Sequence, residues 1–213
     1  MPVSTAASPR PGLPAFLWPL IAALVIVPAC YLWIDRPVAL YFHAHANWEL
    51  VKIAHAMTEI ANPGIWLTGS GLLFLFWRFV RPNAVRAAQA GFIFLCDALG
   101  AGIAELLEKP LGRSRPALLF EHGDYAFAPL RFLHHFNSFP SDHAASAVAM
   151  GVAFGFLFPR WRWPLAALGL LIALTRVVIT AHYLGDALTG AAIGTAMVLA
   201  IHAVFRQRGW LAA

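Results

Sequence analysis

Long runs of apolar residues, separated by short polar turns, constrain this chain more than any other feature of its sequence. Of its 213 residues, 60% are hydrophobic and only 12% are charged, whereas charged residues make up about a quarter of an ordinary soluble domain. One crossing of a bilayer takes about 20 apolar residues, so the chain has room for about six crossings. The sequence therefore predicts an all-α membrane protein.

Six segments are apolar and long enough to be predicted as transmembrane helices. They are residues 13–34, 64–80, 84–108, 141–158, 163–180 and 183–205. The connection between the first two, residues 35–63, is more polar but keeps a helical pattern, which predicts one or two amphipathic helices at the membrane interface. Residues 1–12 are predicted to be a disordered tail, and residues 13–208 are predicted to form a single domain.

The basic residues predict the orientation of the chain in the membrane. With six spans, eight of the fifteen Lys and Arg residues fall on the side that holds both termini, and seven fall on the other side. Four of the seven belong to one cationic cluster, and without them the counts are eight against three. These four are Lys109, Arg113, Arg115 and Arg176. Because positive charge accumulates in cytoplasmic loops, both termini are predicted to be cytoplasmic and the cluster to face the outer side.

The remaining composition excludes several other functions. The net charge of +5 does not come with the basic run and interleaved aromatic residues that a nucleic-acid-binding surface would show. Cys30 and Cys96 lie inside apolar runs without CxxC or metal-ligand spacing, so they are predicted to be buried free thiols. His43, His45 and His55 have no neighbours with ligand spacing, and no metal site is expected from them.

Three short stretches place charged residues at the ends of predicted spans, all on one side of the membrane. They are Lys109 to Pro116, Phe139 to His143, and Thr175 to Asp186. Three arginines and a lysine in a small volume would repel one another unless an anion lay between them, and the planar guanidinium group matches phosphate oxygens. The three stretches therefore predict a phosphate site that uses no metal.

Histidines supply the chemistry that such a site needs. His182 and Asp186 are four residues apart, so they share a helix face if the sixth span begins there, and the carboxylate is expected to orient the imidazole as a nucleophile. His143 comes from another helix end and is expected to protonate the leaving oxygen. Ser141 is predicted to cap the fourth span, whose free backbone N–H groups would point at the anion.

These stretches resemble the three motifs of the type 2 phosphatidic acid phosphatase and vanadium haloperoxidase superfamily: Lys-x6-Arg-Pro, Pro-Ser-Gly-His and Ser-Arg-x5-His-x3-Asp. The resemblance covers residues 90–190 and implies a membrane-bound lipid phosphatase that needs no cofactor. It implies a phospho-His182 intermediate oriented by Asp186, with His143 as acid and then base. It also implies that the phosphate is held by Lys109, Arg115, Ser141 and Arg176.

The first motif departs from the family pattern and leaves an alternative open. Five residues rather than six separate Lys109 from Arg115, and the residue before Lys109 is Glu108, which cannot bind phosphate. Either Lys109 reaches the phosphate through a local adjustment near Pro110, which we favour, or Arg113 takes its place.

The other two motifs carry one substitution each. Thr175 replaces serine, which is a mild change, but Asp142 replaces glycine and would repel phosphate unless it points away or pairs with an arginine. The form Pro-Ser-Asp-His resembles undecaprenyl pyrophosphate phosphatases of the bacitracin-resistance type, so undecaprenyl pyrophosphate is the first substrate expected. Phosphatidylglycerophosphate, phosphatidate and a lipid A phosphate are alternatives, as is transfer of phosphate to a second lipid.

The resemblance also implies a location and partners. A multi-pass protein of a bacterial inner membrane is expected, with its site on the periplasmic side, a lipid phosphate and the bilayer as partners, and no nucleic acid; the sequence does not predict an oligomeric state. A catalytically inactive lipid-binding protein is the alternative from another class, but His143, His182 and Asp186 are intact. A haloperoxidase is not expected, because those enzymes are soluble.

Asp97 and Glu105, inside the third span, are expected to pair with a motif arginine, line a lipid entrance or join helices.

Overall fold

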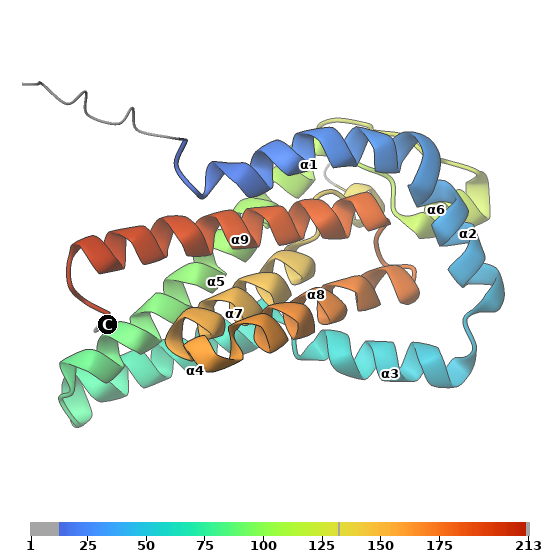
Figure 1. Ribbon diagram of the computed structural model, residues 1–213. Coiled ribbons are helices and arrows are strands. Elements are labelled where there is room, and N and C mark those ends of the chain that lie inside the picture. Colours follow the sequence, from blue (N-terminus) through green and yellow to red (C-terminus); the bar gives the residue numbers. More distant parts are fainter. Residues whose placement is uncertain (1–12, 132, 212–213) are drawn as a thin grey trace, which may run out of the picture.

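The computed structural model describes residues 13–131 and 133–211, so the predicted tail, residues 1–12, lies outside the described residues. The regular elements in this part of the chain are helices (Figure 1). They are α1 (Leu17–Ala29), α2 (Asp35–His45), α3 (Trp48–Glu59), α4 (Pro63–Leu75), α5 (Ala84–Leu111), α6 (Pro116–His122), α7 (Asp142–Leu157), α8 (Arg162–Val178) and α9 (Leu184–Gln207). Short π-helical turns, Cys30–Ile34 and Phe76–Val80, continue α1 and α4.

The prediction of an all-α membrane protein is confirmed. Within the described residues, five helical stretches are long and apolar enough to cross a membrane: Leu17–His45, Trp48–Val80, Ala84–Leu111, Pro159–Val178 and Leu184–Gln207. The other predicted span corresponds to α7, an apolar helix of 16 residues, which is shorter than the roughly 20 residues of a full crossing. The count of six crossings therefore stays a prediction.

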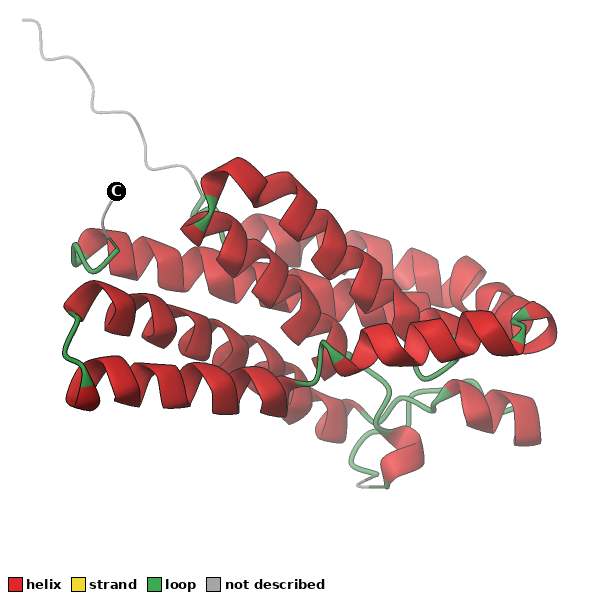
Figure 2. Cartoon of the chain, turned by 90° about the horizontal axis from the view of Figure 1, so that it is seen from below, coloured by secondary structure: helices red, strands yellow, loops and turns green. Residues whose placement is uncertain are grey.

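The long helices lie side by side in one bundle (Figures 1 and 2). Its centre is α7, which packs against α5, α8 and α9, while α4 covers α5 and α1 covers α9. The α1 helix begins and α9 ends at one end of the bundle, and the long irregular loops gather at the other end (Figures 1 and 2). The three motif stretches meet at this loop-bearing end, as the sequence predicts.

The segment after the first span holds two helices. A π-helical turn at Cys30–Ile34 follows Pro28, and the chain then turns into α2, which crosses the end of the bundle (Figure 1). Sharp changes of helix direction are typical of prolines and π-turns. Helix α3 packs along α8. The sequence pattern therefore predicts the two helices but not the packing of α3 on the bundle.

Small residues bring the central helices into backbone contact. A Cβ atom added at Gly194 of α9 would collide with the carbonyl oxygen of Ala145 in α7, and one added at Gly169 of α8 would lie 2.6 Å from the carbonyl oxygen of Ala147. Helices in membranes associate through such close contacts, because lipid provides no hydrophobic driving force between them. The central α7 helix is therefore held at backbone distance from both neighbours.

The ionisable groups of α5 have different surroundings. Asp97 is fully buried and accepts a hydrogen bond of 2.5 Å from the Ser146 hydroxyl of α7. Of the three expectations for Asp97, a contact between helices is the one that the structure shows. Glu105 lies on the exposed side of α5 and pairs with Lys109.

Leucine at position 194 should destabilise the bundle by about 1–3 kcal/mol or more, because the added atoms would force α9 away from α7. Thermal unfolding of the purified protein in detergent would measure the loss. Gly102 of α5 provides a matched control, since a Cβ atom there would meet nothing within 4 Å. Equal losses in Gly194→Leu and Gly102→Leu would contradict the close approach of α7 and α9.

Candidate active site

The loop before α7 is joined to the first motif by hydrogen bonds. The backbone N–H of Arg115 donates to the carbonyl of His135 at 2.8 Å, and Nε of Arg115 donates to the carbonyl of Asn137 at 2.9 Å. The backbone N–H of Ser138 donates to the carbonyl of Arg113 at 3.1 Å. These bonds fix the loop against the end of α5.

The same loop holds His182, which is 1% exposed. Its Nδ1 lies 2.7 Å from the carbonyl oxygen of Ser138. A carbonyl oxygen only accepts hydrogen bonds, so Nδ1 carries the proton and Nε2 keeps its lone pair. Nε2 is buried and makes no hydrogen bond to any described residue. This is the tautomer that a nucleophilic imidazole requires.

Asp186 orients His182 indirectly, which differs from the expected direct contact. Its Oδ2 lies 3.9 Å from Nδ1 of His182, too far for a hydrogen bond. That oxygen accepts instead from the Ser138 hydroxyl at 2.6 Å and from the Tyr183 backbone N–H at 2.8 Å. Ser138 therefore connects the carboxylate to the imidazole: its hydroxyl binds Asp186 and its carbonyl binds His182. The sequence reasoning missed this serine, which lies just before the second motif.

Arg113 is fully buried between two carboxylates. Its Nη1 donates to Oδ1 of Asp186 at 2.5 Å, and its Nη2 donates to Oδ2 of Asp35 at 2.8 Å. Burial alone would lower the pKa of Arg113, but Asp186 and Asp35 raise it above its usual value, so the guanidinium stays charged. The alternative in which Arg113 binds phosphate does not fit, because both ends of its fork are occupied by carboxylates.

Asp35 is the second site residue that the sequence reasoning missed. It begins α2, is fully buried, and accepts a further hydrogen bond of 2.8 Å from the backbone N–H of Gly185 at the start of α9. The sequence does contain a signal, since an acidic residue directly after an apolar span usually has a specific partner. That partner, Arg113, is 78 residues away.

Asp142 pairs with a histidine and not with an arginine. Its Oδ1 accepts from the backbone N–H of His143 at 2.7 Å and lies 3.0 Å from Nδ1 of the same residue. A carboxylate at this position keeps the proton on Nδ1 and leaves Nε2 of His143 to exchange a proton. Ser141 caps α7 as predicted, accepting from the backbone N–H of Ala144 at 3.3 Å.

Two predicted phosphate-binding cations, Arg176 and Arg115, act electrostatically on His182. Burial lowers the pKa of His182 well below the ordinary value, and the positive charges of Arg176 and Arg115 lower it further. Arg176 extends from α8 to within 3.4 Å of the Thr58 hydroxyl, and its Nε has no hydrogen-bond partner among the described residues. Arg115 also contacts Glu108 at 3.4 Å. The phosphate-binding roles of Arg115 and Arg176 stay predictions from the family motifs.

Lys109 lies apart from these groups. Its side chain is 49% exposed and pairs with Glu105 at 3.4 Å along the outer face of α5. The preceding residue, Glu108, occupies the family's lysine position and faces Arg115. A phosphate-binding role for Lys109 is predicted by motif spacing alone, whereas its exposed side chain and its pairing with Glu105 favour a position outside the site.

The His182 ring should stay neutral, with its proton on Nδ1, as the pH falls through 6.5, the ordinary pKa of histidine. Between 6.5 and the lowered pKa, the unfolded chain binds a proton at this residue that the folded chain does not, so this group makes stability fall as the pH falls. NMR of ¹⁵N-histidine-labelled protein, with the His182 signal assigned by comparison with His182→Gln, would measure both the pKa of the ring and which nitrogen carries the proton. A His182 signal that titrates near pH 6.5, or a proton on Nε2, would contradict the geometry.

Asp35→Ala should lower stability by about 3–5 kcal/mol, because it leaves the charge of Arg113 with a single carboxylate in a buried site. The same change should reduce kcat, since Arg113 also holds Asp186. A double-mutant cycle of Asp35→Asn with Arg113→Gln should be strongly non-additive in both measurements. Asp124→Asn, at an exposed position of the same end, is the control. Additive losses, or stability lost without any change in kcat, would contradict the coupling to the nucleophile.

Comparison with known proteins finds relatives of this chain among lipid phosphatases. Lipid A 1-phosphatases from Rhizobium johnstonii and Rhizobium etli are 29% and 28% identical to this chain over 174 residues, which is 82% of this chain. The match covers only 62% and 65% of those two relatives, so the chain spans less than two thirds of their length.

The fold has a similar counterpart among solved structures. The crystal structure of a transmembrane PAP2 type phosphatidylglycerolphosphate phosphatase from Bacillus subtilis matches 90% of this chain and 96% of its own, with a TM-score of 0.68 and 17% identity. The family model of the PAP2 superfamily matches residues 89–210, more than half of the chain, and this range contains the three motifs but not Asp35. The chain therefore belongs to the PAP2 superfamily.

Proposed function

We propose that this protein removes phosphate from a membrane lipid through a phosphohistidine formed on Nε2 of His182. One observation carries the proposal: the hydrogen bond from Nδ1 of His182 to the Ser138 carbonyl leaves the lone pair of the buried Nε2 available for attack. Because burial and the charges of Arg176 and Arg115 lower the pKa of His182, the imidazole does not need to lose a proton before it attacks.

The proposed reaction has two steps. Nε2 of His182 attacks phosphorus, the bond from phosphorus to the lipid oxygen breaks, and His143 donates a proton to that oxygen. A water molecule then attacks the phosphohistidine while His143 takes its proton, which releases inorganic phosphate and restores the free imidazole. Arg115 and Arg176 stabilise the negative charge on the phosphoryl oxygens in both steps. The contact with Asp142 orients His143 for both proton transfers.

A lipid A phosphate is our first proposal for the substrate, because both curated relatives are lipid A 1-phosphatases. Undecaprenyl pyrophosphate is the second, on the strength of the Pro-Ser-Asp-His form of the second motif. The contact of Asp142 with His143 offers a reason for that aspartate that does not involve a pyrophosphate. The arginine count supports a site that opens to the periplasmic face of a bacterial inner membrane, with both termini in the cytoplasm.

Purified protein should release phosphate from lipid A faster than from undecaprenyl pyrophosphate or phosphatidylglycerophosphate, without an added divalent metal. His182→Ala should reduce this activity by about 10³-fold or more, because the nucleophile is lost. With ³²P-labelled substrate, acid-labile and alkali-stable label should accumulate on the wild-type chain but not on His182→Ala.

Lys109→Ala is the matched control for the basic residues of the first motif. We expect it to keep most of the activity, since Lys109 is exposed and paired with Glu105, whereas Arg115→Ala should raise KM and lower kcat. Label that persists in His182→Ala would overturn the proposed nucleophile. A faster reaction on undecaprenyl pyrophosphate would overturn only the choice of substrate.

A further inference from the structure

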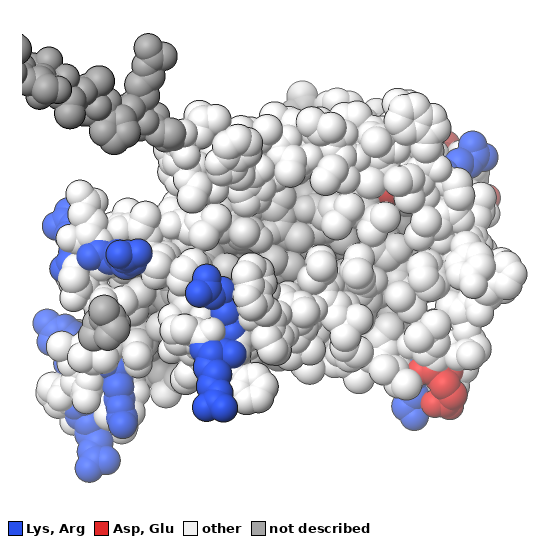
Figure 3. All heavy atoms as spheres, in the orientation of Figure 1, with Lys and Arg blue, Asp and Glu red and all other residues white. Residues whose placement is uncertain are grey.

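Basic residues lie at both ends of the bundle, but on the face that Figure 3 shows the acidic residues lie only toward the loop-bearing end. All ten acidic residues lie within the ranges 35–59 and 97–142 or at position 186. The end opposite the catalytic site, here called the distal end, carries arginines at positions 78, 81, 86, 160, 162, 206 and 208 and no acidic residue. Positive charge at this end therefore lacks the internal compensation that the catalytic end has.

Part of this charge faces a cavity. A cavity of about 760 Å³ opens at the distal end between α5, α7 and α9, and its polar lining is Gln89, Arg162, His202 and Arg206. Phe156 and Leu211 contribute to its apolar wall. The lining thus combines hydrogen-bond donors that carry positive charge with an apolar surface.

The backbone of Arg162 and the ring of His202 pack against α7, whereas the side chains of Arg162 and Arg206 are exposed. The Cα of Arg162 lies close to α7, since a Cβ atom at Gly155 would be 3.2 Å from it. His202 stacks on Phe156 with a distance of 3.8 Å between ring centroids. In the described part of the chain, neither Arg162 nor Arg206 forms an ion pair with a carboxylate. The Lys and Arg residues that do so are Lys109, Arg113 and Arg115. Two guanidinium groups that face one cavity favour a shared anion, and phosphate oxygens match their geometry.

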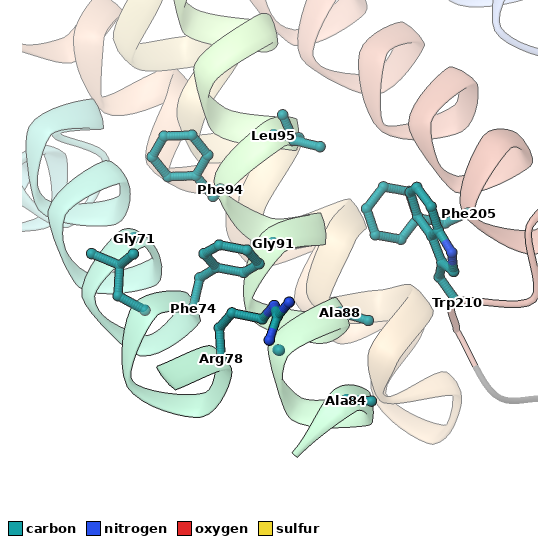
Figure 4. A pocket seen from close by; sticks show the side chains of 12 residues that line it. Gly71, Phe74, Arg78, Ala84, Ala88, Gly91, Phe94, Leu95, Phe205 and Trp210 are labelled. Carbon is teal, nitrogen blue, oxygen red and sulfur yellow. The ribbon is translucent and has the colours of Figure 1, made fainter. Parts of the chain in front are cut away.

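The surroundings of the cavity indicate a lipid. Exposed Trp161, Trp163 and Trp210 lie at the same end, as is typical of residues at the level of lipid headgroups. A second hollow, which is almost wholly apolar, lies between α4, α5 and the end of α9. Arg78 lies beside Phe74 on one side of it, and Phe205 and Trp210 lie across from them (Figure 4). In a bilayer, acyl chains fill a surface of this kind.

Membrane orientation alone explains why arginines lie at the distal end. It does not explain why two of them, Arg162 and Arg206, line the same cavity. Arg160 and Arg208 lie two residues from Arg162 and Arg206, contribute equally to the charge of this end, and do not line the cavity. We propose that the cavity of Arg162, Arg206, His202 and Gln89 binds the phosphate headgroup of an anionic phospholipid in the leaflet at the distal end. This site is separate from the catalytic site and does not depend on the proposed function.

The test is lipid binding measured by native mass spectrometry of the detergent-purified full chain, titrated with phosphatidylglycerol or with phosphatidylcholine. Wild-type protein should bind one phosphatidylglycerol in preference to phosphatidylcholine. The double variant Arg162→Gln with Arg206→Gln should weaken this binding by about tenfold or more, because charged hydrogen bonds to the phosphate are lost. The matched control, Arg160→Gln with Arg208→Gln, should change it by less than about twofold, since its charges face outside the cavity.

Three outcomes would overturn the proposal. An equal loss in both double variants would show that only the overall positive charge attracts the lipid. Equal binding of the two lipids would show that the headgroup charge is not recognised, and displacement of bound phosphatidylglycerol by inorganic phosphate would show a site for the free anion. Phosphate release at the catalytic end should stay unchanged in both double variants. If the double variant fails to fold, Arg206→Gln alone, at an exposed position in the last turn of α9, gives the same comparison against Arg208→Gln.

Discussion

The buried guanidinium of Arg113 is the interaction on which the catalytic end depends. It joins Asp35 at the start of α2 to Asp186 in the first turn of α9. Two carboxylates around one cation leave excess negative charge, which is costly in a buried site unless other donors compensate it. The start of α9 supplies them, because the backbone N–H groups of Gly185 and Tyr183 donate to the two carboxylates and a helix N-terminus favours negative charge.

The position of His182, the proposed nucleophile, depends on Arg113 and Asp186 through one serine. Asp186, held by Arg113, binds the hydroxyl of Ser138, and the carbonyl of Ser138 binds His182. The imidazole is thereby oriented without direct contact with a carboxylate. Because the match to the family model begins at residue 89, the part of the chain that contains Asp35 lies outside it, yet it completes the electrostatics of the site.

The parts of this site that the sequence predicts are those with local signatures. Apolar runs and motif spacing predict the helices and the meeting of Arg176, His182 and Asp186 at one end, because hydrophobicity and helical periodicity act over short distances. The partners of Arg113 and Asp142 depend on how the bend after α1 and the loop before α7 fold against distant helices. No spacing encodes those contacts. The sequence leaves Asp142 either pointing away from the phosphate or pairing with an arginine, whereas in the structure it contacts His143.

The distribution of acidic residues explains how one bundle can hold phosphate at its catalytic end without a metal. Arg113 is neutralised by aspartates, Lys109 by Glu105, and Arg115 partly by Glu108. Arg176 forms no ion pair with a carboxylate in the described residues, and its nearest polar partner is a threonine hydroxyl. A partly buried cation without a carboxylate costs free energy that an incoming phosphate would recover. The acidic residues of this end therefore fix the scaffold and leave uncompensated charge at Arg176, where we propose that the transferred phosphoryl group binds.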